Sequence, residues 1–209
     1  MNVTEILAKA WPVMPVIVID EPKHALPMAE ALREGGVTVL EITLRTDAAF
    51  TAISAIAKAL PDVVVGAGTV LTGEQLQRVK DAGAAFAVSP GLTEKLLLAA
   101  DRIKLPLLPG AVTASEIQLA LEYGLQTLKF FPAEAAGGAP VIKAFHGPFS
   151  QLRFCPTGGI STSNATQYLS LPNVACVGGS WLTPAAEMKA GNWSALTALA
   201  RASRLLSAS

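Results

Sequence analysis

The chain lacks several features that mark common protein classes. Its 16 basic and 16 acidic residues cancel to a formal net charge of +0. Proteins that bind nucleic acid or anionic membranes usually carry an excess of basic residues on one face, and this composition gives no sign of such an excess. We therefore expect no nucleic acid partner and no membrane partner.

Long apolar runs are also absent from the sequence. The nearest candidate, Val13 to Ile19, ends at Asp20 and is much shorter than the roughly 20 residues that a membrane-spanning helix needs. It also lacks the basic flank and the small-residue cleavage site of a signal peptide. We interpret this run as a buried strand and expect a cytoplasmic protein.

Residues that bind metals or form disulfides are scarce. The two histidines, His24 and His146, show no HxxxH or HxH spacing, so we expect them at the surface or in loops and expect no metal site. The two cysteines, Cys155 and Cys176, stand inside apolar runs and form no CxxC motif. That pattern predicts buried free thiols in a reducing compartment, and the sequence indicates no cofactor.

What the chain does contain is a regular alternation of strand and helix patterns. Hydrophobic residues make up 51% of its 209 residues, which is too many for a disordered chain. Eight predicted strands each precede a helix, and this alternation is typical of a closed (β/α)8 TIM barrel. We expect one barrel domain over residues 1–209, with a short N-terminal helix and a C-terminal helical extension. An open doubly wound sheet is the main alternative, although no GxGxxG follows the first strand.

The predicted elements follow from hydrophobic periodicity and from turn residues. Strands are expected at residues 13–20, 37–45, 63–70, 84–89, 105–108, 127–132, 152–155 and 174–177. Helices are expected at residues 2–10, 21–33, 47–60, 72–83, 93–100, 114–123, 140–144, 162–169 and 184–206, the last broken at Gly191-Asn192. Asn2 or Thr4 can cap the first helix.

The run Thr127-Leu128-Lys129-Phe130-Phe131-Pro132 places a lysine inside an apolar strand. Burying an ammonium group is costly unless it is paired or loses its proton, and a lone strand lysine usually extends to water. Apolar side chains on both faces of the strand and the small residues Ala135-Ala136-Gly137-Gly138 after it favour a buried lysine at a strand end. A desolvated lysine there can act as an amine nucleophile.

The second predicted strand carries polar residues at alternate positions. Glu41, Thr43 and Arg45 stand at i, i+2 and i+4 and share one face, while apolar residues occupy the other. Because the apolar face should contact the helices, we expect the three polar side chains to point into the barrel. A carboxylate beside Lys129 would supply the proton acceptor that amine-based carbonyl chemistry needs. An internal ion pair that only fills the barrel is the structural alternative.

Glycine-rich segments end or follow three predicted strands, at the end where barrel enzymes carry their active sites. Gly66-Ala67-Gly68-Thr69 would let a ligand approach the backbone, although small residues there can equally serve barrel closure. Pro156-Thr157-Gly158-Gly159 and Val177-Gly178-Gly179-Ser180 follow the seventh and eighth strands, the frequent phosphate position of this fold. Backbone amides near helix N-termini bind anions, so these segments predict a phosphate site, with two tight turns as the alternative.

Six segments of the chain together resemble a known family. They read GVTVLEITLRT, VGAGTVLT, FAVSPG, LKFFPAE, FCPTGGIS and CVGGSW, within a stretch from about Pro12 to Thr183. On these motifs the chain resembles the bacterial 2-keto-3-deoxy-6-phosphogluconate (KDPG) aldolases, a Schiff-base aldolase family also tied to 2-keto-4-hydroxyglutarate (KHG). The resemblance implies a (β/α)8 barrel, a homotrimer and no metal. The segment AVTASE departs from the family, because many members have proline in place of Ala114.

The resemblance also implies a reaction and roles for particular residues. The implied substrate is a phosphorylated keto acid, KDPG, which is cleaved to pyruvate and glyceraldehyde 3-phosphate. Lys129 would be the Schiff-base lysine and Glu41 the general acid and base. Arg45 and Thr69 would bind the substrate carboxylate. The phosphate would be bound by Gly158, Gly159, Gly179 and Ser180.

Three rival functions remain open at this point. An aldolase of the same fold could prefer KHG, which has no phosphate. A metal-dependent aldolase is a second alternative, disfavoured by the scarcity of histidine. The third is a non-catalytic phosphosugar-binding barrel, in which Lys129 would serve only as the charge partner of Glu41.

Overall fold

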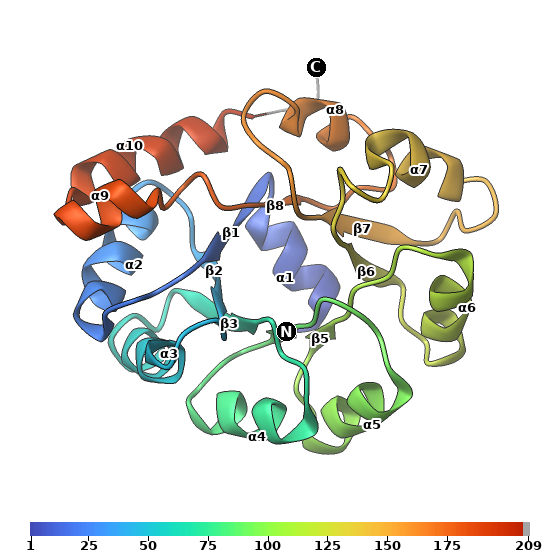
Figure 1. Cartoon of the computed structure of the whole chain (residues 1–209), viewed down its shortest axis with the longest axis horizontal. Coiled ribbons are helices and arrows are strands. Elements are labelled where there is room, and N and C mark those ends of the chain that lie inside the picture. Colours follow the sequence, from blue (N-terminus) through green and yellow to red (C-terminus); the bar gives the residue numbers. More distant parts are fainter. Residues whose placement is uncertain (207–209) are drawn as a thin grey trace.

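The computed structural model describes residues 1–206 and contains eight strands with parallel pairing. In chain order they are β1 (Val13–Ile17), β2 (Val39–Thr43), β3 (Val64–Gly68), β4 (Ala87–Val88), β5 (Leu107–Leu108), β6 (Thr127–Phe130), β7 (Arg153–Pro156) and β8 (Val177–Gly179). They form a six-stranded sheet in the order β5-β4-β3-β2-β1-β8 and a two-stranded sheet of β6 and β7. Bridges from Gly110 to Lys129 and from Thr157 to Gly178 join the two sheets, so the strands close into a barrel (Figure 1).

Helices surround this barrel on the outside (Figure 1). A 3-10 turn, η1 (Pro22–His24), leads into the first of them, and the helices that follow the strands are α2 (Ala25–Glu34), α3 (Ala48–Ala59), α4 (Gly73–Asp81), α5 (Glu94–Ile103), α6 (Ala114–Glu122), α7 (Gly138–Phe145), α8 (Ala165–Leu169), α9 (Ala185–Ala190) and α10 (Trp193–Arg204). The predicted (β/α)8 barrel with a C-terminal helical extension is confirmed, and the open doubly wound alternative is wrong.

The observed strands are mostly shorter than the predicted ones. The expected strand at 84–89 contracts to β4, and the expected strand at 13–20 ends at Ile17. Ile19 is nevertheless fully buried, because the surrounding helices cover apolar residues beyond the last ladder hydrogen bond. The predicted strand at 174–177 is displaced to β8, since Val174 contributes only a single bridge to Phe154.

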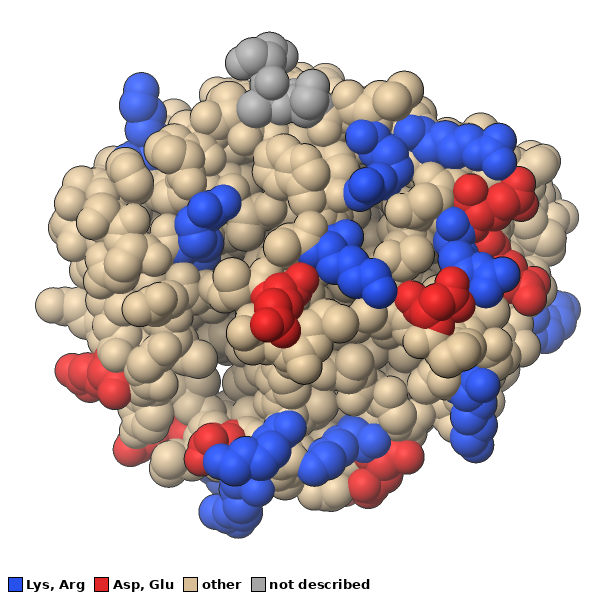
Figure 2. All heavy atoms as spheres, turned by 180° about the vertical axis from the view of Figure 1, so that it is seen from behind, with Lys and Arg blue, Asp and Glu red and all other residues tan. Residues whose placement is uncertain are grey.

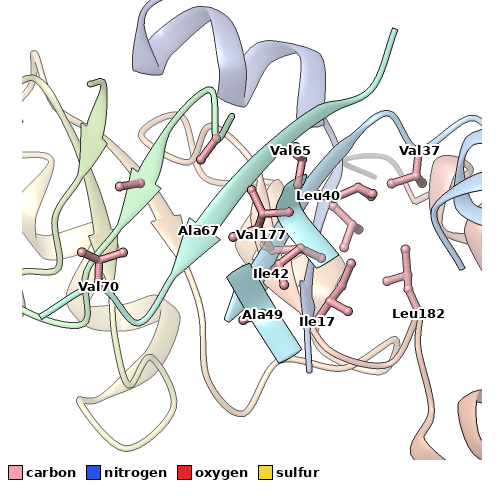
Figure 3. Packing of buried hydrophobic residues seen from close by; sticks show 14 of the residues in the cluster. Ile17, Val37, Leu40, Ile42, Ala49, Val65, Ala67, Val70, Val177 and Leu182 are labelled. Atoms are coloured by element: carbon pink, nitrogen blue, oxygen red, sulfur yellow. The ribbon is translucent and has the colours of Figure 1, made fainter. Parts of the chain in front are cut away.

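Buried side chains form two layers separated by the strands. The outer layer packs between strands and helices, and Figure 3 shows Leu40 and Ile42 of β2 there beside Val65 and Ala67 of β3. The inner cluster fills the barrel itself with Ile6, Leu7, Ala10, Met14, Val39, Phe86, Val88, Leu108, Cys155 and Cys176. Alternate strand residues therefore face opposite layers, as period-two geometry requires.

The N-terminal helix α1 (Val3–Ala10) plugs the barrel. Its residues Ile6 and Leu7 belong to the inner cluster, and Figure 1 shows the helix crossing the barrel centre. Asn2 is the N-cap in a capping box, because its side chain accepts from the Glu5 amide at 2.9 Å and Glu5 accepts from the Asn2 amide at 2.9 Å. The residues of β2 and β4 that share a cluster with α1, such as Val39 and Val88, precede Glu41 and Ser89 in the chain. The helix α1 therefore covers the N-terminal ends of the strands, and their C-terminal ends stay open for a site.

The outer surface mixes charges of both signs. Figure 2 shows acidic and basic side chains interspersed on the face opposite to that of Figure 1. Among the exposed ion pairs, Arg201 lies 2.9 Å from Glu34 and Arg33 lies 3.2 Å from Asp62. None of the helices within residues 1–206 combines the length and the apolar character needed to cross a bilayer.

Candidate active site

Lys129 of β6 and Glu41 of β2 meet inside the barrel. The Lys129 Nζ lies 3.3 Å from Glu41 Oε1, although the two residues are 88 positions apart in the chain. The Glu41 side chain is fully buried, and only 7% of the Lys129 side chain is exposed. The lysine is therefore buried and paired, and it does not extend to water as a lone strand lysine usually does.

The alternation of β2 explains how Glu41 reaches the interior. Leu40 and Ile42 pack in the outer layer, whereas Val39 belongs to the inner cluster. Glu41 and Thr43 continue the inward-facing series and are both fully buried. The Thr43 hydroxyl donates a hydrogen bond to the Ile17 carbonyl at 2.9 Å, which braces β2 against β1 beside the acidic residue.

One oxygen of Glu41 has no partner within residues 1–206. Glu41 Oε2 is fully buried and receives no hydrogen bond there. Leaving a buried acceptor unpaired costs about 1–3 kcal/mol. A water molecule or a substrate hydroxyl group at this oxygen would relieve that cost, so the pair combines an amine with an available proton acceptor.

The small residues of β3 create the space that this pair occupies. A Cβ atom added to Gly68 would collide with the Glu41 carboxylate, and one added to Gly66 would collide with the Phe86 ring. Both glycines therefore serve packing inside the barrel. Of the two alternatives for this segment, the structure favours the packing role at Gly66, because the Phe86 ring fills the position beside its α-carbon.

Arg45 lies beyond the end of β2 and is exposed, unlike the buried Glu41 and Thr43 of the same series. The strand ends at Thr43, and one more hydrogen bond, from the Leu44 amide to the Gly68 carbonyl at 2.8 Å, extends its pairing with β3. The chain turns there, and Arg45 is exposed at the rim. Its predicted role as a carboxylate-binding residue stays a prediction.

Thr69 follows β3 at the same rim and has an unusual backbone. Its φ angle is 60°, a left-handed conformation that is costly for a β-branched residue and that concentrates at functional sites. The residue is half-buried, and the next amide, that of Val70, donates to the Val88 carbonyl at 3.1 Å. This strained backbone supports the prediction that Thr69 contacts the substrate.

The glycine turn after β7 lies beside the glycines of β8, which belong to that strand and form no turn after it. A bridge joins Thr157, the residue before the Gly158–Gly159 turn, to Gly178 of β8. Gly158 and Gly159 have φ angles of 98° and 78°, which favour glycine. Within the described residues, the amides of Gly159 and Ser180 donate no hydrogen bond. The turn and the end of β8 thus leave free N–H donors of the kind that bind anions.

The glycines themselves are also required by packing. A Cβ atom added to Gly159 would lie 2.6 Å from Glu134 Cγ, and one added to Gly158 would lie 3.2 Å from the Phe131 ring. A Cβ atom added to Gly179 would collide with the Trp181 ring. Protein side chains therefore fill the positions beside these α-carbons, and a bound anion would have to contact the amides and the Ser180 hydroxyl.

The two cysteines are buried free thiols, as the sequence predicts. Cys155 Sγ lies 3.6 Å from Cys176 Sγ in the inner cluster, and Cys155 stands opposite Lys129 in the register of β6 and β7. The hydrogen bond with Cys155, together with burial, raises the pKa of Cys176 well above its usual value. The Cys176 thiol is consequently neutral, and both cysteines pack beside the candidate site.

The histidines contribute nothing to this site. His24 belongs to η1 and makes an edge contact with Trp193 at a centroid distance of 5.5 Å. His146 follows α7 directly. Both are half-buried, and His146 lies in a turn, in line with the surface or loop position expected for it. No group of three or more His, Cys, Asp or Glu residues in the described part of the chain is placed to hold a metal ion.

Sequence reasoning missed three residues that border the site. The Phe131 ring centroid lies 5.1 Å from Lys129 Nζ and its ring also faces Gly158, so an apparent core residue contacts both the lysine and the glycine turn. Glu134 and Tyr168 form a hydrogen bond beside Gly159. The segment LKFFPAE contains two of these residues, but nothing in the sequence around Tyr168 indicates its partner.

Comparison with known proteins gives a consistent result. A family model described as KDPG and KHG aldolase matches residues 3–199. The KHG/KDPG aldolase of Escherichia coli (strain K12) is 56% identical over 197 residues, which are 94% of this chain and 92% of that protein. Sequence similarity therefore extends through nearly all of the barrel.

Two solved structures have the same fold as this chain. KDPG aldolase from Legionella pneumophila, with pyruvate captured at low pH as a covalent carbinolamine intermediate, is 50% identical with a TM-score of 0.94, covering 97% of this chain and 98% of that chain. The 2-keto-3-deoxy-6-phosphogluconate aldolase of Zymomonas mobilis ZM4, with 3-phosphoglycerate, is 46% identical with a TM-score of 0.92, covering 99% and 97%.

Proposed function

This chain belongs to the KDPG and KHG aldolase family, and on that premise we propose that Lys129 is the nucleophile of a Schiff-base aldolase. The enzyme cleaves KDPG to pyruvate and glyceraldehyde 3-phosphate. The observation that carries the assignment is the buried pair of Lys129 and Glu41, with 3.3 Å between nitrogen and oxygen. Lys129 is also the only buried lysine among residues 1–206.

The reaction follows from the chemistry of an amine and a carboxylate in one enclosed site. The neutral Lys129 amine attacks the C2 ketone of the substrate, and loss of water gives a protonated imine. When the C3–C4 bond breaks, its electron pair moves to the imine nitrogen and leaves an enamine of pyruvate. Glu41 accepts the proton of the C4 hydroxyl group, through a water molecule. Protonation and hydrolysis of the enamine then release pyruvate.

The remaining site residues bind the two ends of the substrate. Arg45, a planar fork of donors at the rim, binds the substrate carboxylate together with Thr69. The free amides beside the glycine turn and β8 bind the phosphate. The proposed phosphate set is Gly158, Gly159, Gly179 and Ser180. Support comes from the position of these residues at the open end of the barrel and from the unpaired amides of Gly159 and Ser180.

The proposal extends to the assembly and its location. We propose that residues 1–209 form one domain that assembles as a homotrimer in the cytoplasm. Light scattering should give a mass near three times the 21.6 kDa of the chain, and a monomeric mass would contradict the trimer. Thermal unfolding should show one cooperative transition if the chain is a single domain.

Borohydride trapping tests the nucleophile directly. Incubation with pyruvate and sodium borohydride should reduce the imine to a stable secondary amine, and peptide mapping should place the adduct on Lys129. Lys129→Arg should lose both the adduct and the cleavage activity, because a guanidinium group is not a nucleophile near neutral pH. Lys143→Arg, at an exposed position of α7, is the matched control and should behave like wild type.

The same experiment separates the proposal from its rivals. An adduct on another lysine would overturn the assignment of Lys129. Absence of any adduct, with binding of phosphorylated sugars retained, would indicate the non-catalytic barrel. A ratio of kcat/KM values that favours KHG over KDPG would identify the enzyme as a KHG aldolase.

A further inference from the structure

A polar contact outside the catalytic pair lies directly against the proposed phosphate turn. The hydroxyl group of Tyr168, on α8, donates a hydrogen bond to Glu134 Oε1 in the loop after β6. We propose that Glu134, held by Tyr168, is a positioning residue that fixes the Gly158–Gly159 turn for the phosphate group of the substrate. This inference rests on the phosphate site of the proposed function and assigns to it a supporting pair of side chains.

Backbone hydrogen bonds attach the Glu134 loop to the glycine turn. The Ala133 amide donates to the Thr157 carbonyl at 2.8 Å, and the Glu134 amide donates to the Gly158 carbonyl at 3.1 Å. These bonds continue the pairing of β6 and β7 beyond the ends of the strands. Any displacement of Glu134 is therefore transmitted to the carbonyl that precedes the free Gly159 amide.

The side chain of Glu134 also covers the turn. A Cβ atom added to Gly159 would lie 2.6 Å from Glu134 Cγ and 2.7 Å from Glu134 Cβ, so the aliphatic part of Glu134 lies against the Gly159 α-carbon. The same contact limits how far the turn can move toward β6. The Glu134 side chain consequently helps to fix the direction of the free Gly159 amide.

Tyr168 keeps the Glu134 side chain in one conformation. Glu134 is exposed and would otherwise be free to change rotamer, whereas Tyr168 is fully buried in the outer layer. Burial and the bond to Glu134 raise the pKa of Tyr168 above its ordinary value, so its hydroxyl remains a donor throughout the neutral range. A buried hydroxyl donor without an acceptor would be destabilising. This cost favours the Glu134 rotamer that accepts the hydrogen bond from Tyr168.

The start of α7 belongs to the same contact. A Cβ atom added to Gly138 would lie 3.3 Å from the Tyr168 hydroxyl oxygen and 3.5 Å from Glu134 Oε1. The Gly138 amide donates to the Ala133 carbonyl at 2.9 Å. The Tyr168–Glu134 pair therefore joins three segments, namely the loop after β6, the start of α7 and α8, around one turn.

Because the pair touches neither Lys129 nor Glu41, its loss should affect binding of the phosphate half and not the bond-breaking step. Tyr168→Phe removes one hydroxyl group and keeps the aromatic ring. We expect KM for KDPG to rise about tenfold, which corresponds to the low end of the free energy that a hydrogen bond to a charged group contributes. The value of kcat for KDPG and kcat/KM for KHG should stay close to wild type, and pyruvate trapping on Lys129 should persist.

A matched control exists elsewhere in the chain. The Tyr123 hydroxyl donates to Glu94 Oε1 at 2.6 Å, at the end of α6 and away from the glycine turn. Tyr123→Phe removes the same kind of bond and should leave both substrates unaffected. A similar KM rise in both variants would overturn the proposal, because the effect would then reflect general destabilisation.

Two variants of the acceptor keep the test decisive if Tyr168→Phe folds poorly. Glu134→Gln retains an acceptor oxygen, so its KM for KDPG should lie between those of wild type and Tyr168→Phe. Glu134→Ala removes both the acceptor and the cover over Gly159, and its KM should rise at least as much as that of Tyr168→Phe. An unchanged KM for KDPG in Glu134→Ala would overturn the positioning role.

Ser180→Ala separates failure of this inference from failure of the phosphate site. If Ser180→Ala weakens only KDPG cleavage while the Glu134 and Tyr168 variants match wild type, the phosphate site stands and the positioning role is wrong. If none of these variants distinguishes KDPG from KHG, the phosphate site itself is misplaced and the inference is overturned with it. Loss of pyruvate trapping in wild type would instead refute the Schiff-base function.

Discussion

Glu41→Gln offers the sharpest test of the catalytic pair. The substitution keeps the shape of the side chain and removes the proton acceptor. Since Glu41 is fully buried and lies 3.3 Å from the Lys129 amine, the amide oxygen of glutamine can still accept a hydrogen bond from that amine. The variant should therefore fold, and the change in activity should report on proton transfer.

The expected magnitude follows from the role assigned to Glu41. A general acid or base typically contributes ~10²- to ~10⁴-fold to the rate, which is about 3 to 5 kcal/mol of activation free energy at 1.36 kcal/mol per tenfold. We expect kcat for KDPG to fall within this range. If Glu41 were only a structural counter-ion, the pattern would differ. Its removal from a buried pair would cost about 3–5 kcal/mol of folding free energy, and the molecules that still fold would keep the wild-type kcat.

Two assays distinguish the possibilities. The first is steady-state cleavage of KDPG, together with the melting temperature of wild type and variant. The second is exchange of the pyruvate methyl hydrogens with solvent deuterium, which requires the enamine but no phosphate. It should slow by a comparable factor in Glu41→Gln, because a general acid and base at Glu41 also transfers the proton at the enamine carbon. The adduct formed with pyruvate and borohydride should persist at saturation, because Lys129 is unchanged.

A matched control is Glu116→Gln. Glu116 completes the capping box of α6 with Thr113, and glutamine serves equally well at that position. Turnover in this variant should equal that of wild type. Unchanged turnover in Glu41→Gln, with a lowered melting temperature, would refute the acid–base role and leave Glu41 as the charge partner of Lys129.

Three further predictions concern the rest of the site. Ser180→Ala should lower kcat/KM for KDPG roughly ten- to hundredfold, because one hydrogen bond to a charged acceptor is lost, and should leave kcat/KM for KHG unchanged. Gly179→Ala is a poorer test, because its methyl group would collide with Trp181 and lower stability as well. A chelator should leave cleavage intact, since no metal-binding group of residues occurs within residues 1–206; restoration of lost activity by a divalent ion would contradict this. Cys155 and Cys176 should resist a thiol reagent in the native protein and react in denaturant, because both are buried and the pKa of Cys176 is raised.

Local patterns in the sequence predicted much of the architecture. The alternation of apolar runs located seven strands closely and the eighth with a shift, because each strand must present one face to the helices. The apolar run around Lys129 indicated that this lysine is buried, and the capping residues Asn2 and Thr72 began helices where expected. These features depend on neighbours within a few residues, which is the range over which a sequence pattern is informative.

Errors arose where local periodicity stopped applying. Arg45 continues the series of Glu41 and Thr43 in the sequence, but it lies outside β2, in a turn, and is exposed where the other two are buried. The glycines near the site suggested open backbone for a ligand, yet Phe86, Glu134 and Trp181 fill the space beside several of them. A one-dimensional pattern cannot show which distant side chain occupies the space beside a glycine.

The sequence by itself therefore determined the strands, the barrel and the burial of Lys129. Only the tertiary structure brought Lys129 within 3.3 Å of Glu41 across 88 positions, placed Cys155 against Cys176, and joined Tyr168 to Glu134 beside Gly159. The physical reason is that closure of the barrel depends on the register between strands, which long-range packing sets and which no local period encodes.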